Sequence, residues 1–164
     1  MDRRRAIALL AVSTRALAQP GSANPLIGCW NLRSCVRTFR DGQTQYHFGC
    51  EPVGRIEYDK AGRVFALLMR PERHTTVLPG MELDQAPPDE LREIVTGFVS
   101  YFGTFDVDQA NHSVTHHVEA SLVPSWVGTN LKRNFHFEGS SLVLTRVSPD
   151  GTSSDRLIWD RMTD

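Results

Sequence analysis

The segment 101–119, YFGTFDVDQANHSVTHHVE, holds the side chains of this chain that are best suited to chemistry. It predicts two strands joined by a tight turn at 108–111, and alternation along each strand decides which side chains share a face. His116 falls on an apolar face with Phe105, opposite Gly103, which leaves room beside the imidazole. An inward imidazole can bind a ligand carbonyl or act as a general acid or base near neutral pH. A hydrogen-bonded structural histidine is the alternative.

The residues His112, His116, His117 and Glu119 also raise the question of a metal site. Ligands on one strand must share a face, and His117 and Glu119 do so, but they are only two. His112 and His116 share the other face about 13 Å apart, which is too far for one ion. We therefore expect no metal site. Glycine loops for phosphate, dinucleotide fingerprints and the G-x-S-x-G motif are missing, so the sequence predicts no cofactor and no serine nucleophile.

Two arginines near the C-terminus form a second candidate site. Arg133 and Arg146 fall on the same predicted strand face as Asp155. Side by side on an inward face, the two guanidinium groups could hold a ligand carboxylate through paired hydrogen bonds. A structural ion pair with Asp155 at a barrel end is equally compatible with the pattern. Some anionic partner is expected in either case, because unpaired buried guanidinium groups are costly.

Aromatic side chains supply the other candidates for a binding site. Tyr58, Tyr101 and Trp126 would line or cap a cavity whose walls include Phe105 and Phe135. Aromatic residues on strands also pack into cores, so a purely structural role stays open.

Short strand patterns separated by turn signals recur along the chain after its first 23 residues. The only helical pattern covers 89–101, where apolar residues follow one stripe after a Pro-Asp start signal. The predicted strands cover 26–40, 46–50 (weakly), 55–59, 63–70, 103–107, 112–119, 131–138, 141–147 and 156–161.

The last three predicted strands agree with one another in register. A turn at Gly139-Ser140 pairs Phe135 with Leu144, and a turn at Asp150-Gly151 pairs Leu144 with Leu157, so these residues share one apolar face. Sequential strands with hairpin connections predict an all-β fold, an antiparallel up-and-down barrel of about eight strands with one helix. Barrels of this size can hold one small ligand. A two-sheet sandwich is the competing architecture.

Composition limits the classes of protein to consider. The chain has 164 residues and a net charge of −1, which suits one domain and gives no indication of nucleic-acid or anionic-membrane binding. No apolar run approaches the roughly 20 residues of a membrane-spanning helix. Nothing in the sequence indicates the oligomeric state.

The first 23 residues differ from the rest. A basic stretch at 3–5, an apolar stretch at 6–12 and an A-x-A pattern ending at Ala18 predict a signal peptide, although Arg15 interrupts it. We therefore expect residues 1–23 to be a leader and 24–164 to form the barrel domain of an exported, periplasmic or secreted protein. A disordered leader on a cytoplasmic protein is the alternative.

Three cysteines follow the leader, at Cys29, Cys35 and Cys50. A two-residue turn at Gly42-Gln43 would set Cys35 across from Cys50, close enough for a disulfide in an exported protein. Three buried thiols are the alternative, and the sequence leaves the two open.

The chain also resembles a known family, the lipocalin-like domain family of bacteria and fungi. The resemblance rests on motifs that occur in order over nearly the whole chain after the leader. They are Gly28-x-Trp30, Pro52-x-Gly54-x-Ile56-x-Tyr58, Met69-Arg70-Pro71, Tyr101-Phe102-Gly103-Thr104, Val114-Thr115-His116-His117-Val118-Glu119, Ser121-x-x-Pro124-x-Trp126-x-Gly128-Thr129, Arg133-x-Phe135 and Leu157-x-Trp159-x-Arg161.

This resemblance implies a calycin-like barrel with an internal pocket. By analogy with lipocalin-type barrels, Trp30 packs at the closed end, Leu32 and Val36 also point inward, and Cys35 points outward. Some fungal relatives look like cyclases acting on natural products, and no catalytic motif carries over.

The predicted function is therefore the binding of a small, largely apolar molecule inside the barrel. The contacts would come from His116, Arg133, Tyr101, Tyr58, Trp126, Arg146, Phe105 and Phe135. A cyclase or isomerase acting on a small hydrophobic substrate is the alternative, with His116 as its acid or base and Arg133 or Tyr101 stabilising charge. A barrel filled by its own side chains, serving as an interaction module, is the third possibility.

Overall fold

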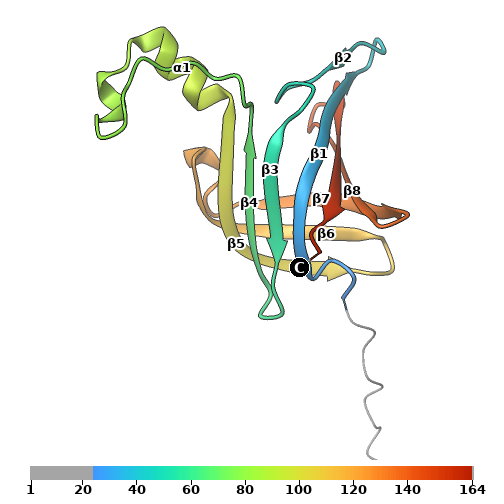
Figure 1. Ribbon diagram of the computed structural model, residues 1–164. Helices are drawn as coiled ribbons and strands as arrows, with labels where there is room; N and C mark the ends of the chain where they lie inside the picture. Colours follow the sequence, from blue (N-terminus) through green and yellow to red (C-terminus); the bar gives the residue numbers. More distant parts are fainter. Residues whose placement is uncertain (1–23, 164) are drawn as a thin grey trace, which may run out of the picture.

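The computed structural model of the protein describes residues 24–163, so the predicted leader lies outside the described residues. Within them, eight long antiparallel strands form a closed barrel, because β1 pairs with both β3 and β9 (Figure 1). The predicted up-and-down barrel with one helix is confirmed. The elements are β1 (Gly28–Phe39), β2 (Thr44–Gln45), β3 (Val53–Tyr58), β4 (Arg63–Met69), η1 (Leu83–Gln85), α1 (Pro88–Thr96), β5 (Phe98–Asp108), β6 (Ser113–Ser121), η2 (Pro124–Trp126), β7 (Asn130–Glu138), β8 (Ser141–Val147) and β9 (Ser153–Arg161).

Strand β1 contains a β-bulge between Leu32 and Ser34. Before the bulge, Trp30 and Leu32 are buried in the barrel, as expected. The extra residue shifts the alternation by one position, so that beyond it Cys35 is the buried side chain. The expectation that Cys35 points outward is therefore wrong, and the same shift brings Arg37 inward.

One end of the barrel is sealed around Trp30, which is fully buried. Its indole Nε1 donates to the Leu26 carbonyl oxygen at 2.9 Å, and the Arg161 guanidinium lies 4.0 Å from its ring centroid. Arg161 also donates to the carbonyl oxygens of Ile27 (3.0 Å) and Pro25 (2.8 Å). A cation–π contact and two hydrogen bonds thus join Arg161, the last residue of β9, to Trp30 and to the segment before β1.

The β5–β6 hairpin has the predicted inner face but a different register. Phe105 pairs with His116, and Gly103 pairs with Val118, so the expectation that Gly103 lies opposite His116 is wrong. The reason is that His112 belongs to the turn, with a left-handed φ of 47°. A shift of two residues keeps the alternation, so His116 is still inward and fully buried.

The final three strands have the predicted register. Phe135 pairs with Leu144 and Leu144 with Leu157, and the pairs of Leu142 with Phe137 and Trp159 follow. Two tight turns were enough to determine the alignment here, because neither β7–β8 nor β8–β9 contains a bulge.

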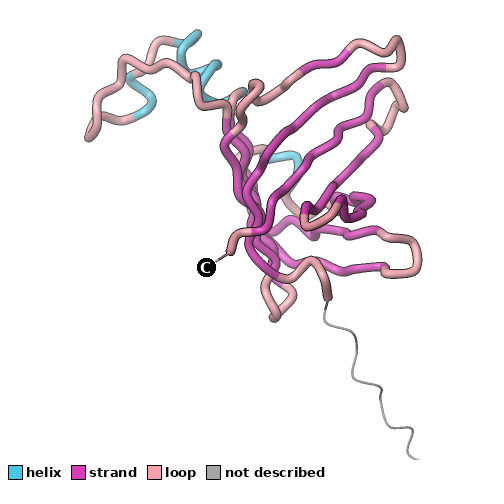
Figure 2. Tube along the Cα trace, turned by 45° about the vertical axis from the view of Figure 1, so that its right-hand side comes forward, coloured by secondary structure: helices cyan, strands magenta, loops and turns pink. Residues whose placement is uncertain are grey.

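The helix is shorter than predicted. It ends at Thr96, and Phe98 already begins β5, because Gly97 terminates the helix. α1 has no buried residue, and with the loop before it extends beyond the barrel next to β4 and β5 (Figures 1 and 2). No helix among residues 24–163 has the length and apolar character needed to cross a membrane.

The weak strand predicted at 46–50 is also wrong, since between β1 and β3 only Thr44–Gln45 forms a strand, which pairs with β1. That register sets Arg37 opposite Gln45, so Cys50 is not the cross-strand neighbour of Cys35. All three cysteines of the described chain are free thiols, and Cys50 is exposed.

Gly103 gives a test of the close packing between β5 and β6. A Cβ on Gly103 would overlap the backbone carbonyl oxygen of His117, which cannot move without breaking the β5–β6 ladder. We expect Gly103→Ala to lower the free energy of unfolding by about 1–3 kcal/mol or more in urea titration. Thr104→Ala, on the exposed face of the same strand, is the control and should change it by less than about 0.5 kcal/mol. Equal effects would contradict the described packing.

Candidate functional site

A cavity of about 160 Å³ lies inside the barrel, at the end opposite the Trp30 seal. Its walls combine an apolar majority with a few charged groups, which come from the four strands β1, β7, β8 and β9. The lining residues are Cys35, Arg37, His47, Phe48, Ile56, Ala66, Leu68, Val99, Tyr101, Trp126, Arg133, Leu144, Arg146, Asp155, Leu157 and Trp159. This mixture is typical of small-molecule sites, where apolar walls supply contact area and a few polar groups fix orientation.

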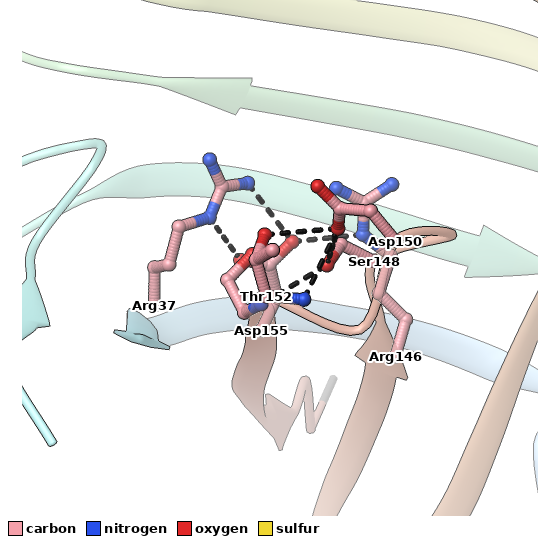
Figure 3. A network of polar contacts seen from close by, with 7 residues as sticks. Arg37, Arg146, Ser148, Asp150, Thr152 and Asp155 are labelled. Atoms are coloured by element: carbon pink, nitrogen blue, oxygen red, sulfur yellow. Dashed lines mark hydrogen bonds and ion pairs between the residues drawn. The ribbon is translucent and has the colours of Figure 1, made fainter. Parts of the chain in front are cut away.

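Asp155 joins two arginines at the edge of this cavity (Figure 3). Its Oδ1 accepts from Arg37 Nε at 2.7 Å, and its Oδ2 accepts from Arg146 Nε at 2.8 Å and Arg37 Nη2 at 3.1 Å. Burial alone would raise the pKa of Asp155, but the hydrogen bonds from both arginines outweigh it and lower the pKa. The carboxylate is therefore ionised and fully occupied. For Arg146, the structural ion pair with Asp155 is thus the interpretation that the geometry bears out.

Arg133 has no such partner. It lies half-buried on β7, and its Nη1 donates to the Lys132 carbonyl oxygen at 2.9 Å. Among the described residues it forms no ion pair with a carboxylate. Burial lowers the pKa of Arg133, although nearby Tyr101 acts in the opposite direction. A guanidinium nonetheless stays protonated in a protein, so the cavity contains an uncompensated cation.

His116 is held between two tyrosines. Tyr58 Oη lies 2.9 Å from His116 Nε2, and Tyr101 Oη lies 2.8 Å from His116 Nδ1. Burial, with the positive charges of Arg133 and His117, lowers the pKa of His116 to about 3, so the imidazole is neutral at physiological pH. Burial likewise raises the pKa of both tyrosines, which keep their protons.

The structure divides the predicted site residues into two groups. Arg133, Arg146, Tyr101 and Trp126 line the cavity, whereas Tyr58, His116, Phe105 and Phe135 do not. The rings of the second group pack against one another in the core, as Phe105 does at 4.9 Å from Tyr58 between ring centroids. Direct ligand contact by these four residues stays a prediction.

Several lining residues were missed by the sequence analysis. Cys35 was expected to point outward and Arg37 was not a candidate, because the bulge in β1 has no obvious sequence signature. His47 and Phe48 belong to an irregular loop. Asp155 was noticed only as a possible ion-pair partner. On the outer surface, His117 bonds Asn130 and Asp106, and the described residues contain no cluster of three potential metal ligands.

Comparison with known proteins agrees with this geometry. A family model described as a lipocalin-like domain matches residues 27–162. A 90-residue stretch is 32% identical to a protein of Aspergillus oryzae named 4'-hydroxy-3'-methoxypropiophenone carrier protein; the stretch covers 51% of this chain and 79% of that relative.

The burial of His116 predicts how the free energy of unfolding depends on pH. The pKa is about 3 in the folded protein and near 6.5 when unfolded, so the unfolded state binds more protons between these values. Stability should thus be complete above pH 6.5 and fall as pH decreases, by at most about 1.4 kcal/mol per pH unit from this residue. Urea titrations from pH 7 to pH 4.5 should show a shallower decline for His116→Gln than for the wild type. His74→Gln, at an exposed position in the loop before η1, should keep the wild-type slope; parallel slopes for all three proteins would contradict the assignment.

Proposed function

Because the chain belongs to the lipocalin-like domain family, we propose that its barrel binds a small, largely apolar molecule in the cavity. The observation that carries this proposal is the space itself. A cavity of about 150 Å³ with apolar walls is enough to hold a benzene ring. The 160 Å³ found here therefore suits a single-ring compound with short substituents.

The composition of the walls supports the same size and kind of ligand. Ile56, Leu68 and Leu144 offer aliphatic surface, while Tyr101 and Trp126 offer aromatic faces 6.0 Å apart between their ring centroids. Edge and face contacts with such rings favour an aromatic ligand. The name of the Aspergillus oryzae relative, a carrier of an aromatic ketone, points in this direction as well.

A catalytic role for His116 receives less support. Both of its ring nitrogens are engaged by tyrosines, its pKa is about 3, and it does not line the cavity. A general acid or base must reach the reacting atoms and exchange a proton near the working pH. The geometry of His116 thus favours binding over the cyclase or isomerase alternative. The cavity likewise favours a ligand carrier over a barrel filled by its own side chains.

Filling the cavity tests the proposal. Ala66 is fully buried in the wall, and Ala66→Leu would occupy a large part of the space without a new polar group. We expect the affinity for 4'-hydroxy-3'-methoxypropiophenone, measured by isothermal titration calorimetry, to fall by at least about tenfold, equivalent to 1.4 kcal/mol.

Ala61→Leu, in the exposed β3–β4 turn, makes the same chemical change away from the cavity and should bind like the wild type. Thermal unfolding of each variant checks that the barrel is intact. Equal affinities of a folded Ala66→Leu variant and the wild type would place the ligand elsewhere.

A further inference from the structure

The polar groups that line the cavity include more hydrogen-bond donors than acceptors. The only carboxylate among its lining residues, Asp155, already accepts hydrogen bonds on both oxygens. Donors, in contrast, remain unused on Arg133, Tyr101 and Trp159. This excess of donors indicates what the ligand must bring.

Charge gives the first argument. Arg37, Arg133 and Arg146 line the cavity together with the single carboxylate of Asp155, which leaves two positive charges in excess. Arg37 and Arg146 share Asp155 and so keep one of these charges between them, whereas Arg133 carries the other with no carboxylate partner among the described residues. A half-buried guanidinium without an anion is unfavourable, and an anionic ligand group would remove that cost.

The tautomer of His116 gives the second argument. A neutral imidazole has one N–H donor and one acceptor, so one tyrosine donates to it and the other accepts from it. The accepting tyrosine keeps its own O–H proton for another partner. Tyr58 is 1% exposed, lies away from the cavity and has no other hydrogen-bond partner among the described residues, so it must be the donor, to His116 Nε2. His116 Nδ1–H then donates to Tyr101 Oη, and the Tyr101 proton is left for a group in the cavity.

Trp159 gives an independent observation. This residue lines the cavity and is 1% exposed, and its Nε1–H has no acceptor among the described residues. Buried donors without partners are rare and usually explained by an absent water, ion or ligand. Trp159 therefore adds a third donor for which the described part of the chain supplies no acceptor.

We propose that the ligand carries an anionic oxygen group, such as a carboxylate or an ionised phenol or enol, which is bound by Arg133 and receives a hydrogen bond from Tyr101. This inference rests on the proposed function, since it names the polar end of a ligand whose apolar part fills the same cavity. Arg133 is then the residue that determines specificity. Tyr58 and His116 are positioning residues, because they act through Tyr101.

A matched pair of ligands tests the charge. The probes are trans-cinnamate and its neutral isostere trans-cinnamamide, titrated by calorimetry at pH 7.5. We expect the wild type to bind cinnamate at least about tenfold more tightly, since a hydrogen bond to a charged group contributes this much or more. Arg133→Met should lose the preference but still bind cinnamamide, whereas Arg55→Met, on the exposed face of β3, should keep it.

The outcomes separate the two proposals. Equal binding of both probes to the wild type would overturn the anionic group and leave the proposed function standing. Binding of neither probe would overturn both. Thermal unfolding without ligand distinguishes a role in ligand recognition from a structural role. Arg133→Met should be at least as stable as the wild type. A marked decrease in its stability, together with loss of binding of both ligands, would assign Arg133 a structural role instead.

Tyr101→Phe and the protonation of His116 test the hydrogen-bond chain. Tyr101→Phe should weaken cinnamate binding by about fivefold or more, because it removes the donor at the cavity. Nitrogen NMR of histidine-labelled wild type should show His116 protonated at Nδ1, because Nε2 accepts from Tyr58. Protonation at Nε2, or an unchanged affinity in Tyr101→Phe, would overturn the chain.

Discussion

The extra residue in β1, between Leu32 and Ser34, determines which side chains the first strand turns into the barrel. Side chains alternate strictly along a regular strand, so without the bulge Cys35 and Arg37 would face solvent. Arg37 could then not reach Asp155, and the ion pair with Arg146 would have to balance a buried carboxylate alone. The bulge thus lets one strand serve two environments: apolar packing at the closed end and a charged edge at the cavity.

This arrangement explains why His116, the first candidate in the sequence, does not line the cavity. His116 belongs to the filled part of the barrel, where two tyrosines satisfy its nitrogens and burial keeps it neutral. Buried polar groups of this kind must be fully hydrogen-bonded, and such a network also fixes the positions of its members. This network therefore fixes the position of the Tyr101 hydroxyl in the wall of the cavity.

The sequence predicted the parts of the fold that depend on alternation and tight turns. The β7–β8–β9 register followed from two turns, and the inner face of β6 was right although the hairpin register differed by two residues. What it missed were the bulge in β1 and the loop that carries His47, because a bulge changes the alternation without requiring a particular residue type. Only half of the predicted site residues line the cavity, because alternation identifies which residues point inward but not how deep along the barrel axis they lie.

The position of a charged side chain along the barrel axis matters, because the free energy of burying it depends on the partners available at that position. Asp155 is ion-paired with both Arg37 and Arg146 at the cavity edge, so these three residues stabilise one another with or without a ligand. Arg133 differs, since its half-buried charge has no ion pair among residues 24–163. A core optimised only for stability would replace it with an apolar side chain. Its presence in the same cavity wall as Tyr101 and the unsatisfied Trp159 indole is explained by a ligand, whose binding to the folded state alone would also raise the stability of the barrel.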